Sequence, residues 1–103
     1  MLIDTEELPC PHCQGIYLHH GKVTIYERLR EDSETGWKTT ISNDGFSTVL
    51  SNVNTIDGNP SCRRDGIRIE LVCEDCHKKS YLTIAQHKGL TMVKQSKTFP
   101  YES

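Results

Sequence analysis

Two short stretches decide the fold of this chain: Pro9-Cys10-Pro11-His12-Cys13-Gln14-Gly15 and Cys73-Glu74-Asp75-Cys76-His77. In each stretch two residues separate a pair of cysteines, and this spacing lets both thiolates point to the same side of a tight turn. Two such turns supply the four ligands of a tetrahedral structural zinc site, which is often made of cysteine alone. The sequence therefore predicts one zinc ion bound by Cys10, Cys13, Cys73 and Cys76.

Length and composition make such a metal important for folding. The chain has 103 residues, of which 35% are hydrophobic, so we expect one domain with a small core. A structural zinc ion contributes on the order of 10 kcal/mol to the folding of small metal-dependent domains. We therefore expect residues 1–103 to form a single zinc-stabilised domain that unfolds, or frays at both ends, without the metal.

The cysteine count argues against a disulfide framework. Five cysteines leave an odd one, Cys62, which we expect to be a buried or half-buried packing residue. Residues 1–7 have neither a basic start nor an apolar run, so we expect no export signal and a cytoplasmic location. In that reducing compartment paired cysteines more often bind a metal. No apolar run approaches the roughly 20 residues of a membrane span.

Most of the chain predicts short strands, and the fold class is therefore mostly β. Hydrophobic and polar residues alternate along 23–29, 37–41 and 67–71, as they do in strands with one buried face. Further strands are expected at 80–87 and 90–94. The 3.6-residue period of a core helix is not convincing anywhere.

Polar and glycine-containing segments predict the connections. Gly21-Lys22 is expected to separate a strand at 16–20 from the strand at 23–29. Asn43-Asp44-Gly45 and Lys88-Gly89 are expected to form hairpin turns. The stretch 51–61, which contains three asparagines, predicts an exposed loop.

The order of elements in the last third resembles the zinc-ribbon family. In residues 66–95 a strand, a Cys-x-x-Cys turn, a strand, a turn and a third strand follow one another, and residues 1–15 supply the second cysteine pair. The resemblance implies a three-stranded antiparallel sheet with the metal at one end. The spacing departs from the family, because 59 residues separate Cys13 from Cys73 where about 15–20 are usual. Residues 16–65 are then an inserted β-meander and loop.

A second resemblance concerns two segments in the second half of the chain. Residues 59–70 and 84–89 are similar to small uncharacterised zinc-ribbon proteins of phages and prophages. This similarity implies a phage-encoded protein in the host cytoplasm that acts on a host factor, and it names no particular activity.

Three other interpretations of the cysteines remain open. Cys10-Pro11-His12-Cys13 has the dipeptide of thiol oxidases with the thioredoxin fold, but a β-pattern follows it instead of a helix. Paired cysteines also resemble the iron site of rubredoxins, which implies an electron carrier. A metal-dependent enzyme is disfavoured, because four thiolates leave no open coordination position. His12 or His77 could replace a cysteine, but we expect both to hydrogen-bond or to face solvent.

The charge distribution leaves two classes of partner. The net charge of −2 disfavours nucleic acid, yet from residue 60 onward eight basic residues outnumber five acidic ones. These eight form a possible basic contact surface: Arg63, Arg64, Arg68, Lys78, Lys79, Lys88, Lys94 and Lys97. We expect a small non-enzymatic zinc module that binds a protein or nucleic acid, with the two about evenly weighted, and neither a membrane nor a small-molecule substrate.

Overall fold

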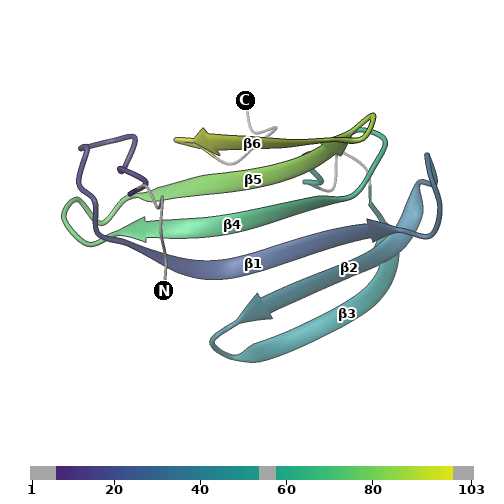
Figure 1. The fold of residues 1–103 in the computed structure, drawn as a ribbon. Coiled ribbons are helices and arrows are strands. Elements are labelled where there is room, and N and C mark those ends of the chain that lie inside the picture. Colours follow the sequence, from purple (N-terminus) through teal and green to yellow (C-terminus); the bar gives the residue numbers. More distant parts are fainter. Residues whose placement is uncertain (1–6, 54–57, 99–103) are drawn as a thin grey trace, which may run out of the picture.

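The computed structural model describes residues 7–53 and 58–98, which contain six β-strands joined in one antiparallel sheet (Figure 1). The strands are β1 (Leu18–Arg28), β2 (Thr35–Ser42), β3 (Gly45–Asn52), β4 (Gly66–Cys73), β5 (Lys79–His87) and β6 (Leu90–Ser96). Their order across the sheet is β3-β2-β1-β4-β5-β6. The mostly-β prediction is confirmed, and no helix in the described ranges is long and apolar enough to cross a membrane.

The inserted meander belongs to the same sheet as the last three strands. Strands β4, β5 and β6 form the three-stranded unit implied by the zinc-ribbon resemblance, and β1, β2 and β3 form the meander. The two units join because β1 pairs with β4 in an antiparallel register that aligns Ile25 with Ile67 and Leu18 with Cys73. The meander thus widens the sheet on one side.

Two predicted turns are confirmed, and one is not. Asn43 and Asp44 connect β2 to β3, and Lys88-Gly89 connects β5 to β6. At Gly21-Lys22, however, β1 continues without a break, and only its register with β4 shifts between His20 and Val23. Glycine inside a strand often marks a β-bulge and glycine is also a common turn residue, so local sequence did not distinguish the two.

The predicted exposed loop at 51–61 is wrong for its described part. β3 extends to Asn52, and Val53, Asn59 and Ser61 are buried; residues 54–57 lie outside the described ranges. Gly66 allows this close approach, because a Cβ at residue 66 would lie 2.7 Å from the Pro60 Cγ atom. The loop therefore forms a second layer over one face of the sheet.

Hydrogen bonds hold this second layer in place. The Asn59 side chain donates to the Val53 carbonyl at 2.7 Å, and its oxygen accepts the Ser61 amide at 3.0 Å. On the sheet beneath, Arg68 donates to the Gly58 carbonyl at 2.9 Å and to the Tyr26 hydroxyl at 3.1 Å. Polar groups that are buried need such partners, so this layer is specified by hydrogen bonds more than by apolar packing.

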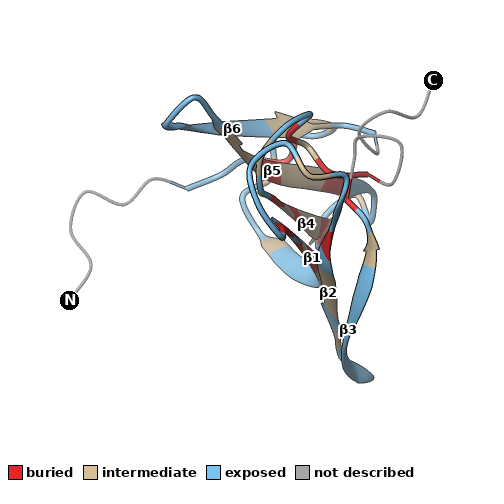
Figure 2. Ribbon diagram, turned by 90° about the vertical axis from the view of Figure 1, so that its right-hand side faces the viewer, coloured by how far each residue is buried: buried red, intermediate tan, exposed pale blue. Residues whose placement is uncertain are grey.

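Burial is unequal across the sheet. Figure 2 shows buried residues on the central strands β1, β4 and β5, whereas β3 and β6 at the two edges are mostly exposed. Within the described ranges the buried hydrophobic residues are few, namely Cys10, Tyr26, Val53, Leu71 and Cys73. The apolar core inside one chain is therefore small, as its composition predicts.

Candidate metal centre

The pairing of β1 with β4 brings the two cysteine turns to the same end of the sheet (Figure 1). Cys73 ends β4 and lies opposite Leu18, the first residue of β1. The segment that carries Cys10 and Cys13 runs directly into β1, and the Glu74 amide donates to the Tyr17 carbonyl at 2.9 Å. Residues about 60 positions apart are therefore neighbours because of the strand register.

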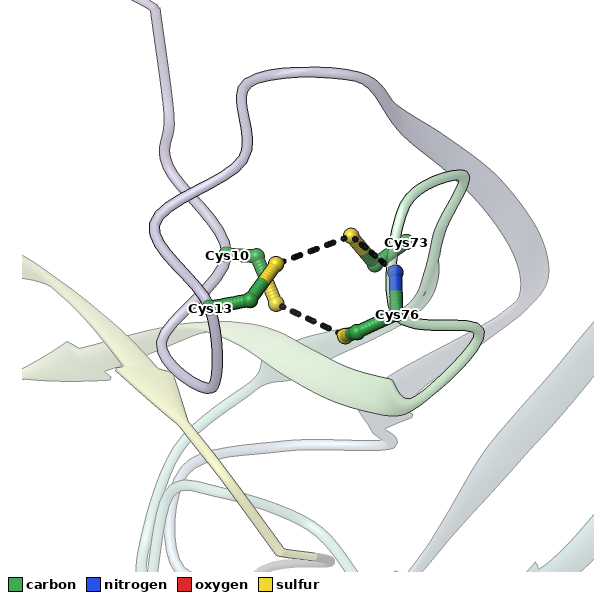
Figure 3. A group of neighbouring side chains, drawn as sticks. All are labelled: Cys10, Cys13, Cys73 and Cys76. Carbon is green, nitrogen blue, oxygen red and sulfur yellow. Dashed lines mark hydrogen bonds between the residues drawn. The ribbon is translucent and has the colours of Figure 1, made fainter.

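The four sulfur atoms form a compact cluster. The Sγ atoms of Cys10 and Cys76 are 3.7 Å apart, those of Cys13 and Cys73 are 3.6 Å apart, and all four lie within 4.8 Å of one another (Figure 3). A disulfide needs about 2.05 Å between its sulfurs. A tetrahedral zinc ion with 2.3 Å bonds needs about 3.8 Å between its ligands. The cluster fits a tetrahedral metal site.

The two turns have the same backbone geometry. The Cys10 amide donates to the Gly15 carbonyl and the Cys73 amide to the Lys78 carbonyl, in each case five residues ahead. The residue after each second cysteine adopts a left-handed conformation, with φ of 69° at Gln14 and 62° at His77. Its amide donates to the carbonyl of the first cysteine at 2.9 Å and 3.0 Å, respectively.

Backbone amides also point at the sulfur atoms. The His12 amide lies 3.4 Å from the Cys10 sulfur, and the Gly15 amide lies 3.4 Å from the Cys13 sulfur. In the second turn the Cys76 amide lies 3.5 Å from the Cys73 sulfur (Figure 3). An N–H donor directed at a thiol favours its charged form. The first turn therefore favours a thiolate at Cys10 before any ion is considered.

The pKa values of Cys10 and Cys13 are shifted in opposite directions. Burial disfavours the Cys10 thiolate, but amide hydrogen bonds from Cys13 and His12 lower the pKa of Cys10 to about 6. The Gly15 amide acts in the same direction on Cys13, yet the neighbouring Cys73 sulfur and burial raise the pKa of Cys13 to about 12. A bound cation resolves this competition, because coordinated thiols are deprotonated.

The histidines beside the cluster are placed as expected. The ring of His12 donates its Nε2 proton to the Lys79 carbonyl at 2.9 Å, which ties the first turn to the start of β5. His77 is exposed. The group of possible metal ligands contains the four cysteines and neither histidine.

Cys62 differs from its prediction. Cys62 is exposed. It lies in the loop that covers the sheet and not in a strand. It is not among the clustered sulfurs. The expected packing role for Cys62 is therefore wrong.

The arginines of the possible basic contact surface bind within the chain. Arg63 contacts both carboxylate oxygens of Asp32 at 2.7 and 3.2 Å, and Arg64 contacts the same carboxylate at 2.8 Å. The Arg63 hydrogen bonds lower the pKa of Asp32. Arg68 is only 8% exposed.

The lysines of that surface are dispersed. Lys79 lies 3.6 Å from Glu70. Lys78 and Lys88 are exposed at opposite ends of β5, and Lys94 and Lys97 are exposed on and after β6. The eight residues therefore do not gather on one patch.

Sequence reasoning missed the residues that shape the turns. These are the left-handed Gln14 and His77 and the amides that face the sulfurs. The only local signal was the two-residue spacing itself, since neither position carries the glycine that usually marks a positive φ.

Comparison with known proteins found no matching family model, no matching curated protein and no matching solved structure. The function is therefore argued from the site itself.

Replacing His77 with glycine tests the geometry of the turn. A left-handed residue other than glycine is strained, so His77→Gly is expected to raise the free energy of unfolding by about 0.5–1 kcal/mol. His77→Val is expected to lower it by about 1–2 kcal/mol. Denaturant unfolding of the metal-loaded protein measures both changes, and metal content is measured in parallel.

The matched control is His12→Gly, at a residue with an ordinary backbone conformation and a side-chain hydrogen bond. This variant is expected to lose about 1–2 kcal/mol and to keep its metal. Loss of metal from His77→Gly would show that this histidine is a ligand.

Proposed function

We propose that this chain is a small non-enzymatic module in which Cys10, Cys13, Cys73 and Cys76 bind one structural zinc ion, and that the module binds a protein partner. The observation that carries the metal assignment is the pair of sulfur–sulfur distances, 3.7 and 3.6 Å. They match the edges of a zinc–thiolate tetrahedron. The ion would link the first cysteine turn to the β4–β5 turn through four metal–sulfur bonds.

The donor set supports a structural role over a catalytic one. Catalytic zinc usually has three protein ligands and one open position for water, whereas four thiolates close the coordination shell. The same four thiolates would suit an iron electron carrier, which is the alternative from the rubredoxin resemblance. An iron site absorbs visible light and a zinc site does not, because zinc has a filled d shell.

The charge arrangement supports a protein partner over nucleic acid. Binding to nucleic acid depends on a basic patch whose side chains are available to phosphates. Here Arg63 and Arg64 already contact Asp32, and Arg68 is buried against Gly58. The similarity to phage and prophage proteins is compatible with a host protein as one such partner.

The zinc assignment predicts one metal ion per chain. Native mass spectrometry of the purified protein is expected to show one zinc, and Cys10→Ser or Cys73→Ser is expected to lose it, because three thiolates close the site poorly. Cys62→Ser is the matched control and is expected to retain one zinc. A visible iron spectrum, or zinc loss on Cys62→Ser, would contradict the assignment.

The proposal of a protein partner predicts that the chain does not bind nucleic acid. Fluorescence anisotropy with single- and double-stranded oligonucleotides is expected to show no binding at about 50 mM salt, where phosphate contacts are strongest. If binding occurs and weakens when Arg63 and Arg64 are both replaced with alanine, with a flatter dependence on salt, the basic contact surface is the correct alternative.

A further inference from the structure

One face of the sheet carries nearly all of the alternating hydrophobic residues. The strand register places Ile25, Ile67, Ile84 and Val93 in one row across β1, β4, β5 and β6. Parallel rows extend onto β2 and β3. We call this set the apolar face, and its members are Val23, Ile25, Trp37, Ile41, Phe46, Leu50, Ile67, Ile69, Leu82, Ile84 and Val93.

The apolar face is opposite the face that the loop covers. The loop packs on Tyr26, Arg68 and Thr83, which alternate with the apolar-face residues along β1, β4 and β5. The apolar side chains toward the two edges stay exposed in the described structure, with Trp37 exposed by 45%, Leu50 by 54% and Phe46 by 79%, whereas those on the central strands are half-buried. A sheet normally buries its hydrophobic face against a second layer. On the apolar face the described residues cover only the end beside the cysteine cluster, where Leu71 and Cys73 are buried and Gln95 donates to the Pro9 carbonyl at 3.0 Å.

Few hydrophobic residues are buried in the part of the chain that the structure describes. They are two cysteines, Tyr26, Val53 and Leu71. Chains of this size bury barely enough surface to fold. A second copy of the chain is present whenever the chain folds, and it can cover the exposed part of the apolar face.

The chemistry of the apolar face also fits a second copy. Among its described strand positions only Glu27, near the end of β1, carries a formal charge. An uncharged face offers no ion pairs to a nucleic acid or to a strongly charged protein. It can pack against the same face of another copy without electrostatic repulsion.

The size of the apolar face is sufficient for a dimer. Five of its eleven members are large side chains that are between 43% and 79% exposed. They offer several hundred Å² of apolar surface on each copy, which is of the same order as the roughly 800 Å² that each partner contributes to a standard interface. Two such faces pack as a β-sandwich with about 10 Å between the sheets.

We propose that the apolar face binds the same face of a second copy, so that two chains form a β-sandwich homodimer. This inference goes beyond the proposed function and rests on the apolar face, not on the cysteine cluster. In a two-fold dimer each residue of the face contacts the equivalent surface of the partner, and the zinc sites and covering loops lie outside the shared core.

The wild-type protein provides the first test. Sedimentation of the zinc-loaded protein is expected to give about twice the mass of one chain at micromolar concentration. Trp37, the one tryptophan in the sequence, lies on the apolar face, so its emission is expected to shift to shorter wavelength as the dimer forms. A monomer at every concentration, or a dimer whose Trp37 remains exposed, overturns the proposal.

Successive side chains of a strand point to opposite faces of the sheet. Lysine substitutions at neighbouring positions of the edge strands β3 and β6 therefore test the apolar face against the opposite face. Leu50→Lys and Val93→Lys put a cation on the apolar face at positions 54% and 63% exposed in the single chain. We expect each to weaken dimerisation on the order of 100-fold, because a lysine buried between apolar sheets has no partner. The controls are Val49→Lys and Met92→Lys, at positions 51% and 53% exposed on the opposite face, and these are expected to change the dissociation constant less than about 3-fold.

Zinc content identifies a folded chain in every variant, since the cluster joins cysteines 60 or more residues apart that meet only when β1 pairs with β4. Equal effects of Leu50→Lys and Val49→Lys would indicate pairing through the β3 edge and would overturn the proposal. A dimer without zinc would contradict only the proposed metal site, and a zinc-loaded monomer would contradict only the dimer.

Discussion

The structure depends on the meeting of four cysteine sulfurs that come from opposite parts of the chain. Cys10 and Cys76 are 66 residues apart, yet their sulfurs are 3.7 Å apart. Closing so long a loop costs conformational entropy, and the apolar core of one chain is too small to offset much of it. Metal coordination at this point would hold the first turn against the β4–β5 turn and, through the adjoining strands, hold β1 beside β4. The pairing of β1 with β4 in turn unites the meander with the ribbon.

The two faces of the sheet depart from the usual pattern, in which the apolar face is covered and the polar face is exposed to solvent. The layer inside the chain is polar: Asn59, Arg28 and Arg68 are buried and donate to backbone carbonyls. The hydrophobic side of the same sheet is open. A polar layer with satisfied hydrogen bonds specifies one arrangement but contributes little net stability. A bound metal and a second layer on the apolar face, as proposed, would add the stability that this polar layer does not supply.

Local patterns in the sequence predicted a substantial part of this structure. The alternation Ile67, Ile69 and Leu71 predicted β4, and Asn43-Asp44-Gly45 predicted the β2–β3 turn, because both signals are read within a few residues. The two-residue cysteine spacing likewise predicted each half of the cluster, whereas the meeting of the two halves depends on the pairing of β1 with β4.

The failures all involve distant partners. The bulge at Gly21-Lys22 depends on the register with β4. The burial of the loop depends on strands far along the chain, since Ser61 accepts from Arg28 and donates to the Gln86 carbonyl. The position of the meander beside β4, and the openness of one face, are likewise set by contacts between segments far apart in the chain.

The central claim is that metal binding and folding of the sheet are one process. It is tested most directly by removing the metal with a chelator while following metal release and the far-ultraviolet circular dichroism of the same sample. The account predicts that both signals change in a single coincident transition and that added zinc restores them together. A metal-free protein with the full β-sheet signal and an unchanged unfolding midpoint would contradict it.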